Sequence, residues 1–533
     1  MTAGDANSAA ADTHVAPRLR WFHFIILIAL LAMGAALRFH DLTKIGLWPD
    51  EFWSSVHMAS GRGNSVLALP SGVLFNPPPQ TELRDAPHWW HIWTGLNTIL
   101  HPPLYLILLR WWMDVFGTSD VSTRCFSTVA SLASVVVLFE IVRKSVSPGA
   151  GLMAAAIMAL APIQINLSVE SRPYTLLALL GLLACHALLR IERRGASPLR
   201  LALLATFAAA TALTHYFSLG ALLAIGGYAV VRLRGTDRRK TVLALCASAL
   251  FVLVAWGPFI LRQHGELATG QKWAGDPSPR TASVLRAIAA PSVFLYGGDE
   301  NKSVWIAPAV IAYLLPLLLM RRQPQLLLWW LWIVGIIGSP LCYDLVRHAR
   351  LLEIVKYISL AAPAMYAICT APLPIRGWWR WTVPGLIVAS VGIAVIERMQ
   401  EGPPDIYGDW RGLAVRLDHR AAAGDPIVFY PNLFWGSPGM YYLDFAHYAP
   451  DSTRPIMYLR EPADDAALRQ LKPYRRIWLV GPAPSDNKTN LLPGWRAVSS
   501  QWFLASGGFV EMVPADNPVV TSVSQPASRP TGP

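Results

Sequence analysis

Charged residues are scarce in this chain. Asp, Glu, Lys and Arg make up only 15% of its 533 residues, whereas apolar residues make up 53%. A soluble domain has about 25% charged residues. Apolar runs of about 18 to 20 residues, long enough to cross a bilayer, recur along most of the chain. This composition excludes a soluble cytosolic enzyme, and the 22 Trp residues exclude a chain that is mainly disordered.

Cysteine is scarce as well. The chain has five Cys, an odd number, and no two are spaced as Cys-x-x-Cys. All five lie in or at the edges of apolar runs: Cys125, Cys185, Cys246, Cys342 and Cys369. We interpret them as small core residues, which excludes a disulfide framework and a zinc site built on cysteine.

Basic residues exceed acidic ones, 45 to 33, which gives a net charge of +12. They lie between the apolar runs, which is typical of cytoplasmic loops and disfavours a nucleic-acid partner. From residue 143 onward the basic clusters occupy every second connection, as alternating crossings require. These clusters are Arg143-Lys144, Arg193-Arg194, residues 232–240, Arg321-Arg322, and Arg376 with Arg380.

The apolar runs predict a polytopic α-helical membrane protein with about eleven spanning helices. Its N-terminus is expected in the cytoplasm and its C-terminus outside. The run 21–37 follows Arg18 and Arg20 and indicates an uncleaved anchor, with a signal peptide as the alternative. The other crossings are expected at residues 122–142, 149–166, 172–190, 198–214, 216–232, 241–260, 304–320, 325–343, 354–371 and 378–396.

The run 101–117 is not counted as a crossing. It opens with Pro-Pro and has Arg110 and Asp114 in its middle. Only one crossing also fits between the first anchor and the basic pair at 143–144. We therefore expect residues 101–117, and the Trp-rich stretch 88–93, to lie at the outer membrane interface as juxtamembrane helices.

The composition divides the chain into four parts. Residues 1–17 are expected to be disordered, and residues 18–400 form the membrane domain, with a first outer loop at 38–121. Residues 401–515 are expected to form a small extracytoplasmic α/β domain, followed by a disordered Pro- and Ser-rich tail at 516–533. Within the α/β domain, strands are expected at 427–430, 476–480 and 503–513, and helices at 410–420 and 463–471.

Ionisable residues gather where the predicted outer loops meet the membrane. The first loop has Asp50-Glu51, His101 precedes the interfacial run, and Glu170 and Arg172 lie in a very short second outer loop. Three further sites lie on the same side: His215-Tyr216, Arg350 and Lys356-Tyr357. Ionisable groups at such depth are costly, so they tend to be paired or functional.

Each of these groups also has a plainer interpretation. Asp50-Glu51 would be a solvated loop pair, and Glu170 with Arg172 a structural ion pair. Lys356 would reach lipid phosphates without any catalytic role.

In this order and spacing the motifs resemble a known family. They are Asp-Glu after the first crossing, His101-Pro-Pro-Leu-Tyr105, Phe-Gly followed by Arg124, and Glu170-Ser-Arg-Pro-Tyr174. The set is similar to the GT-C type glycosyltransferases that use polyprenyl-phosphate-linked sugars. That group includes protein O-mannosyltransferases and the lipid A aminoarabinose transferase. The resemblance covers roughly residues 20 to 400 and is densest from 38 to 216.

The resemblance implies an enzyme of the bacterial inner membrane whose site faces the periplasm. Its donor would be a sugar on a polyprenyl phosphate, and its acceptor would be a hydroxyl of a lipid, glycan or protein. The enzyme would also contact membrane lipids. Asp50 would be the general base, with Glu51 and Glu170 as further catalytic acids. The donor phosphate is expected at His101, Arg172, Lys356, Tyr357 and Arg350, and other substrate contacts at Tyr105, Tyr174, His215 and Tyr216.

A single attack at the anomeric carbon would invert its configuration. The aminoarabinose branch holds a metal ion, for which Asp50, His101 and Glu170 would be the ligands here. This chain has Leu100-His101 where that branch has an acidic residue and Lys, so both no cofactor and a divalent metal ion stay open. A lipid or glycan transporter is the alternative function, which the lack of two related halves disfavours.

Overall fold

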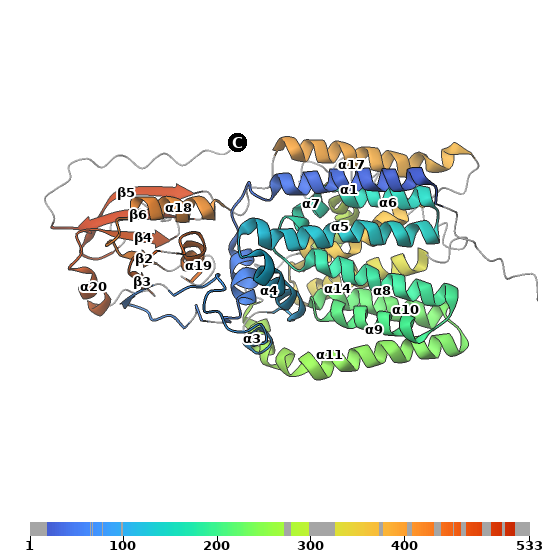
Figure 1. The fold of residues 1–533 in the computed structure, drawn as a ribbon, viewed down its shortest axis with the longest axis horizontal. Coiled ribbons are helices and arrows are strands. Elements are labelled where there is room, and N and C mark those ends of the chain that lie inside the picture. Colours follow the sequence, from blue (N-terminus) through green and yellow to red (C-terminus); the bar gives the residue numbers. More distant parts are fainter. Residues whose placement is uncertain are drawn as a thin grey trace, which may run out of the picture.

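The computed structural model shows a bundle of long helices with a smaller α/β domain at one end (Figure 1). It describes residues 19–516 except for a set of short gaps. These are residues 64, 67, 77, 97–99, 271–278, 298–325, 372–376, 402–407, 431–438, 451, 460–464, 482–491 and 504–506. The predicted disordered ends, 1–17 and 516–533, therefore lie almost entirely outside the described residues.

Six of the described helices are long and apolar enough to cross a membrane. They are α1 (Trp21–Asp41), α5 (Asp120–Ser145), α8 (Tyr174–Arg194), α11 (Gly235–Gly270), α14 (Leu326–Arg347) and α17 (Thr382–Glu401). Shorter apolar helices are α9 (Pro198–Ala212), α10 (Leu219–Arg232), α15 (Val355–Ile358) and α16 (Ala362–Cys369). Together with one bent pair they lie at each predicted crossing except 304–320, which lies outside the described residues. The polytopic helical fold is confirmed.

The bent pair is α6 (Pro148–Leu160) and α7 (Pro162–Ser168), whose axes differ by 58°. Pro162 lacks an N–H and so cannot continue the ladder of α6. The carbonyls freed at the break accept hydrogen bonds from the buried Arg38 of α1. Its guanidinium lies 2.7 Å from the Ala159 oxygen and 3.3 Å from the Met158 oxygen. This buried charge in a spanning helix thus caps the broken end of another helix.

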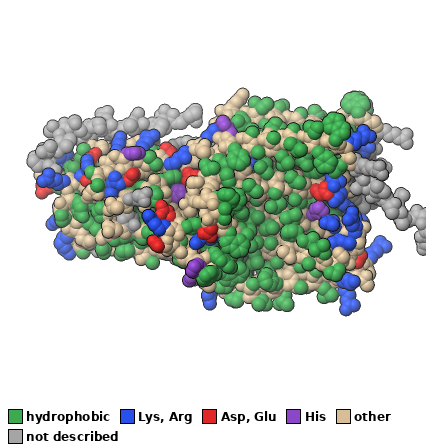
Figure 2. Space-filling model, viewed as in Figure 1, with side chains coloured by type: hydrophobic (Ala, Val, Ile, Leu, Met, Phe, Trp, Pro, Cys, Tyr) green, Lys and Arg blue, Asp and Glu red, His purple; other side chains and the backbone are tan. Residues whose placement is uncertain are grey.

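The basic connections lie together at the end of the bundle away from the α/β domain. Arg193 donates to the Ser145 hydroxyl (3.0 Å), and the Arg232 guanidinium lies 2.9 Å from the Glu192 carboxylate. Figure 2 shows Lys and Arg gathered at this end, beyond a broad apolar surface. The charge pattern therefore agrees with a cytoplasmic basic end and an outer α/β domain, and this orientation stays a prediction.

The run 101–117 forms a short amphipathic helix, α4 (Leu104–Phe116), after the small helix α3 (His91–Gly95). Its 13 residues rise about 20 Å, too short for a hydrocarbon core of about 30 Å. Arg110 is buried and donates to two carbonyl oxygens of the first outer loop, at 2.7 and 3.0 Å. Trp111, Val115 and Phe116 are exposed on the other face, where Trp89 packs on Trp111. This geometry suits an interfacial helix.

The α/β domain has one mixed sheet of six strands, in the order β1-β3-β2-β4-β6-β5. Strands β3, β2 and β4 are parallel, and the other pairs are antiparallel. The strands are β1 (Leu74–Phe75), β2 (Ile427–Phe429), β3 (Ile456–Tyr458), β4 (Ile477–Gly481), β5 (Trp495–Phe503) and β6 (Gly507–Pro514). The helices are α18 (Trp410–Arg420), α19 (Gly439–Tyr448) and α20 (Asp465–Leu471).

The predicted α/β domain is confirmed, with two corrections. The expected strand 503–513 is instead the end of β5 and most of β6, which pair as antiparallel neighbours. The sheet is also not made by residues 401–515 alone, because its edge strand β1 comes from the first outer loop. Strand β3, most of β5 and helix α19 had no counterpart among the predicted elements.

The first outer loop and the α/β domain share one hydrophobic core. Leu47 and Phe52 are fully buried in it, together with Trp410 of α18 and Tyr442 of α19. The Phe52 and Trp410 rings meet edge to face at 5.7 Å. The domain therefore packs directly against the loop that bears Asp50.

The same loop is anchored to α5 by Arg124, a side chain that is almost fully buried. Its guanidinium binds both carboxylate oxygens of Glu51, at 2.9 and 2.5 Å. Its remaining N–H groups donate to the carbonyl oxygens of Leu42 (3.1 Å), Ile45 (2.7 Å) and Gly46 (2.9 Å). All five N–H donors of this arginine are thus used to hold one short loop.

The topology can be tested with reporters. A reporter fused after Gly117 should be active outside the cytoplasm, because α4 is too short to span. The matched reporter after Ser145, at the end of α5, should be active in the cytoplasm. A cytoplasmic signal after Gly117 would make 101–117 a true crossing and contradict the arrangement of the outer loops.

The anchor can be tested by stability. Replacing Arg124 by Gln leaves the Glu51 carboxylate buried without its charge partner, which costs about 3 to 5 kcal/mol. We expect a large drop in the thermal unfolding midpoint in detergent with lipid. The control is Arg143→Gln on the same helix, where the ion pair with Glu140 is partly exposed and contributes about 0 to 1 kcal/mol. Equal midpoints for the two variants would contradict the anchoring role.

Candidate functional site

The predicted site residues meet around Arg172, in the short connection between α7 and α8. Its guanidinium donates to the backbone oxygen of Asp50 (3.0 Å) and lies 3.6 Å from the Asp50 carboxylate. It also lies 3.3 Å from Nε2 of His101. Burial works against the charge of Arg172, but the Asp50 carboxylate outweighs this and raises the pKa above its ordinary value. The first outer loop, the start of α4 and the second outer loop thus converge on one buried cation.

A second ion pair lies beside the first. The Lys356 ammonium of α15 donates to the Glu170 carboxylate (2.9 Å) and lies 4.1 Å from the centre of the Trp48 ring. Glu170 follows α7, and Trp48 lies two residues before Asp50 in the chain. The late helix α15 therefore contributes Lys356 to the same cluster as the two outer loops.

Aromatic rings border the cluster. The His215 ring lies 5.2 Å from that of His101 and 5.5 Å from that of Tyr174. Phe217 stacks on His215 (5.2 Å) and on Tyr357 (4.4 Å). These rings form a continuous wall that contains four of the predicted residues.

Both histidines in this wall are neutral. Burial, followed by the charge of Arg172, lowers the pKa of His215 to about 3 and the pKa of His101 well below its ordinary value. Arginine only donates, so Nε2 of His101 accepts and its proton is assigned to Nδ1. Nδ1 of His215 accepts the backbone N–H of Phe217 (3.2 Å), so its proton is assigned to Nε2. Among the described residues neither of these two buried N–H groups has a hydrogen-bond partner.

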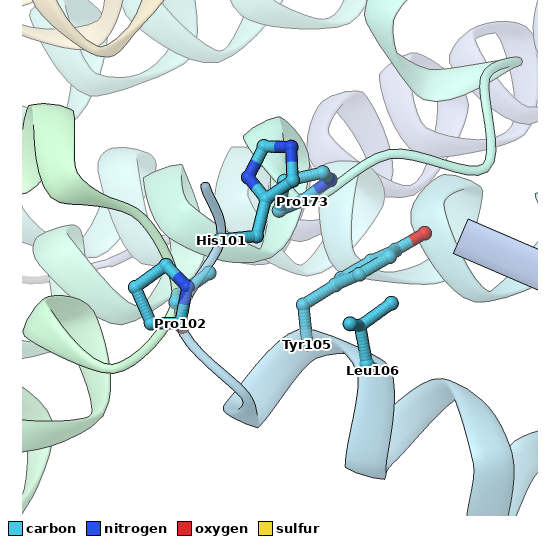
Figure 3. A pocket seen from close by; sticks show the side chains of 6 residues that line it. His101, Pro102, Tyr105, Leu106 and Pro173 are labelled. Atoms are coloured by element: carbon cyan, nitrogen blue, oxygen red, sulfur yellow. The ribbon is translucent and has the colours of Figure 1, made fainter. Parts of the chain in front are cut away.

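A small cavity of about 10 Å³ lies next to His101, enough for one water-sized group (Figure 3). It is lined by His101, Pro102, Tyr105, Leu106, Pro173 and Thr214. The Tyr105 hydroxyl lies 3.4 Å from the hydroxyls of Ser127 and Ser171. Tyr105 therefore lies beside His101 at this cavity and contacts the second outer loop through Ser171.

Glu51 faces away from this cluster. One of its oxygens accepts the backbone N–H of Ser171 (2.7 Å) and the other that of Trp48 (3.2 Å), and Arg124 binds both. Its side chain is fully buried, whereas that of Asp50 is 36% exposed. The two adjacent acids thus occupy different environments, with Glu51 as an anchor and Asp50 at the open side.

Two other predicted residues have their described contacts elsewhere. The Tyr216 hydroxyl donates to Gln263 (2.6 Å) and accepts from Trp256 (2.9 Å), both on α11. Arg350 lies 3.6 Å from the Glu353 carboxylate. These contacts do not bring either residue into the cluster around Arg172.

Two residues of the site, Trp48 and Phe217, were not predicted from the sequence. Trp48 lies in the first-loop motif, but nothing in the motif shows that its ring faces Lys356. Phe217 joins the aromatic wall only because a short turn after His215 brings it back onto that ring. Arg124 was part of the resemblance, but its partner Glu51 could not be inferred from spacing.

The candidate metal ligands do not fit a metal ion. The Arg172 guanidinium already lies between Asp50 and His101, and the Lys356 ammonium lies on Glu170. In the part of the chain that the structure describes, no three His, Cys, Asp or Glu side chains are grouped so that they could hold a metal ion. Two built-in cations therefore occupy the positions expected of the metal.

The chain is similar to known proteins in sequence over one segment and in fold over most of its length. Residues 100–261 match the family described as dolichyl-phosphate-mannose-protein mannosyltransferase. The apo structure of ArnT from Cupriavidus metallidurans is similar with a TM-score of 0.55 and 12% identity, covering 91% of this chain and 97% of that one. The same protein bound to undecaprenyl phosphate gives a TM-score of 0.52 with the same identity and coverage. No curated protein sequence matches the chain significantly.

The likeness in fold confirms the predicted architecture of a helical membrane domain followed by a small sheet domain. The family match falls on the segment from the His-Pro-Pro motif through the second outer loop to α11. The resemblance inferred from the motifs is thereby confirmed, and a glycosyltransferase is favoured over a transporter. The chain therefore shares the fold of ArnT over most of its length, and its segment 100–261 is similar to a family of membrane glycosyltransferases.

Proposed function

We propose that this enzyme moves a sugar from a polyprenyl phosphate to an acceptor hydroxyl at the end of the bundle that bears the α/β domain. In a bacterial inner membrane this end would face the periplasm. A structure of similar fold is bound to undecaprenyl phosphate, which supports a donor lipid of this class. The observation that carries the proposal is the contrast between Asp50, partly exposed beside a cation, and Glu51, buried in an anchor.

Asp50 is the general base of the proposed reaction. Its carboxylate takes the proton of the acceptor hydroxyl as that oxygen attacks the anomeric carbon. The bond between the anomeric carbon and the phosphate oxygen breaks, and the electron pair leaves with the polyprenyl phosphate. One displacement of this kind inverts the configuration of the sugar. Glu51 cannot share this role, because both its oxygens are bound by Arg124 and backbone N–H groups.

Arg172 and Lys356 stabilise the charge on the departing phosphate. Both cations lie at the cluster and are held by carboxylates, Asp50 for one and Glu170 for the other. Charge-assisted hydrogen bonds of this kind are stronger than neutral ones and act most where water is excluded. Glu170 in this scheme orients Lys356.

His101 and His215 bind substrate oxygen atoms. Each offers a buried N–H that no described residue accepts, and each is neutral, so neither adds charge to the site. An unsatisfied buried donor is costly, and a sugar hydroxyl or phosphate oxygen would relieve that cost. Tyr174, Phe217 and Tyr357 then present ring surfaces to the apolar parts of the donor.

The base can be tested directly. Asp50→Asn keeps the shape of the side chain but cannot accept the proton, so transfer should fall by about 10²- to 10⁴-fold. The assay supplies polyprenyl-phosphate sugars with membrane extract as acceptor and measures released polyprenyl phosphate. Asp114→Asn is the control, because Asp114 is an exposed partner of Arg110 on α4. Near wild-type transfer by Asp50→Asn would remove Asp50 from the mechanism.

Metal dependence provides a second test. Because two side-chain cations occupy the expected metal positions, a chelator should leave the transfer rate within about twofold of the untreated enzyme. Metal analysis of the purified enzyme should show less than one bound ion per chain. Loss of activity on chelation, with recovery on adding a divalent ion, would show that the arginine and lysine do not replace the metal.

A further inference from the structure

The loop that bears Asp50 is held from two opposite sides. On the membrane side Arg124 of α5 binds Glu51 and three backbone carbonyls. On the other side lie α18 and α19 of the α/β domain. The domain therefore contacts the loop within a few residues of the proposed base.

Tyr448, the last residue of α19, makes the most direct of these contacts. Its hydroxyl accepts the backbone N–H of Leu47 (2.6 Å) and donates to the Asp120 carboxylate (2.8 Å). Leu47 lies three residues before Asp50, and Asp120 is the first residue of α5. One hydroxyl thus ties the loop to the beginning of α5, one turn before Arg124.

The Asp120 carboxylate is itself fixed by the domain. Its second oxygen lies 2.9 Å from Nε2 of His447, whose Nδ1 lies 2.9 Å from the Thr81 hydroxyl. The side chains of His447 and Asp120 are almost fully buried. The Asp120 carboxylate, which accepts the hydrogen bond of the Tyr448 hydroxyl, is therefore held in a fixed position.

The backbone of the loop approaches the domain closely at Gly46. A Cβ atom there would lie 2.6 Å from Cβ of Arg411 and 3.0 Å from the Tyr448 hydroxyl. Arg411 of α18 also donates to the Thr43 oxygen (2.9 Å). Loop and domain fit so tightly at this point that no side chain could be placed between them.

We infer that Tyr448 is a positioning residue for the transfer reaction, and that the α/β domain thereby completes the active site. Its hydroxyl fixes Leu47 against α5 and so sets where the Asp50 carboxylate points. The inference rests on the proposed role of Asp50. It assigns to the α/β domain a part in catalysis in addition to any contact with an acceptor.

Tyr448→Phe in the full chain tests this inference. The substitution removes only the hydroxyl, so the packing of α19 is kept. A small displacement of the Asp50 carboxylate slows proton transfer from the acceptor hydroxyl. It leaves binding of the donor intact. We expect kcat to fall by about tenfold, with KM for the donor within about twofold.

Tyr442→Phe is the matched control. Tyr442 lies on the same helix, and its substitution removes a hydroxyl that donates to the Pro78 oxygen (2.7 Å), far along the loop from Asp50. We expect its kcat to stay within about twofold of the wild type. Equal kcat values for the two variants would overturn the inference, as would a fall in kcat matched by a rise in KM.

A second measurement does not depend on activity. Hydrogen exchange of the Leu47 amide should speed up about tenfold in Tyr448→Phe and stay unchanged in Tyr442→Phe. Unchanged exchange in Tyr448→Phe would overturn the inference even if transfer is slowed. If the wild type releases no polyprenyl phosphate, the proposed function fails, while the exchange result still decides whether Tyr448 holds the loop.

Discussion

The bidentate contact between Arg124 and Glu51 is the interaction on which the site depends. A buried carboxylate and a buried guanidinium are each costly, and they are tolerated only because every donor and acceptor is used. The contact fixes the first outer loop, where Glu51 ends the short helix α2 (Pro49–Glu51), against a spanning helix. Through the Ser171 N–H it also joins this loop to the second outer loop, where Arg172 lies. The two outer loops are thus held in place by one side chain of a spanning helix.

Charge balance explains how so many ionisable groups lie together near a membrane. Two carboxylates, Asp50 and Glu170, face two cations, Arg172 and Lys356, and the adjacent histidines remain neutral. The resting cluster therefore carries little net charge and remains compatible with burial. The same arrangement leaves cationic side chains ready for a phosphate, because a bound anion can share them with the carboxylates.

Much of the fold could be predicted from the sequence, because long apolar runs and basic connections report directly on spanning helices. Arg110, a charge that a lipid-facing span would not tolerate, also predicted that residues 101–117 do not cross the membrane, and α4 is too short to span. The two-residue strand β1 and the tie between Leu47 and Tyr448 were not, since each joins segments nearly 400 positions apart without a pattern of its own. The outer-loop cluster was found, but the contacts of Glu51 with Arg124 and two backbone N–H groups could not be inferred from its place beside Asp50 in the chain. Consecutive residues on a helical turn point about 100° apart, so adjacent acids can serve opposite sides.

The edge strand β1 has a consequence for biogenesis. Its partner β3 is made about 380 residues later, which takes tens of seconds at a rate of about 5 to 20 residues per second. In the predicted orientation, the first outer loop crosses the membrane during that time, before α18 and α19 exist. Until then Leu47 lacks the Tyr448 hydroxyl, the contact that we infer to set the direction of Asp50. If Tyr448 positions Asp50 as inferred, only a fully synthesised chain has the complete site.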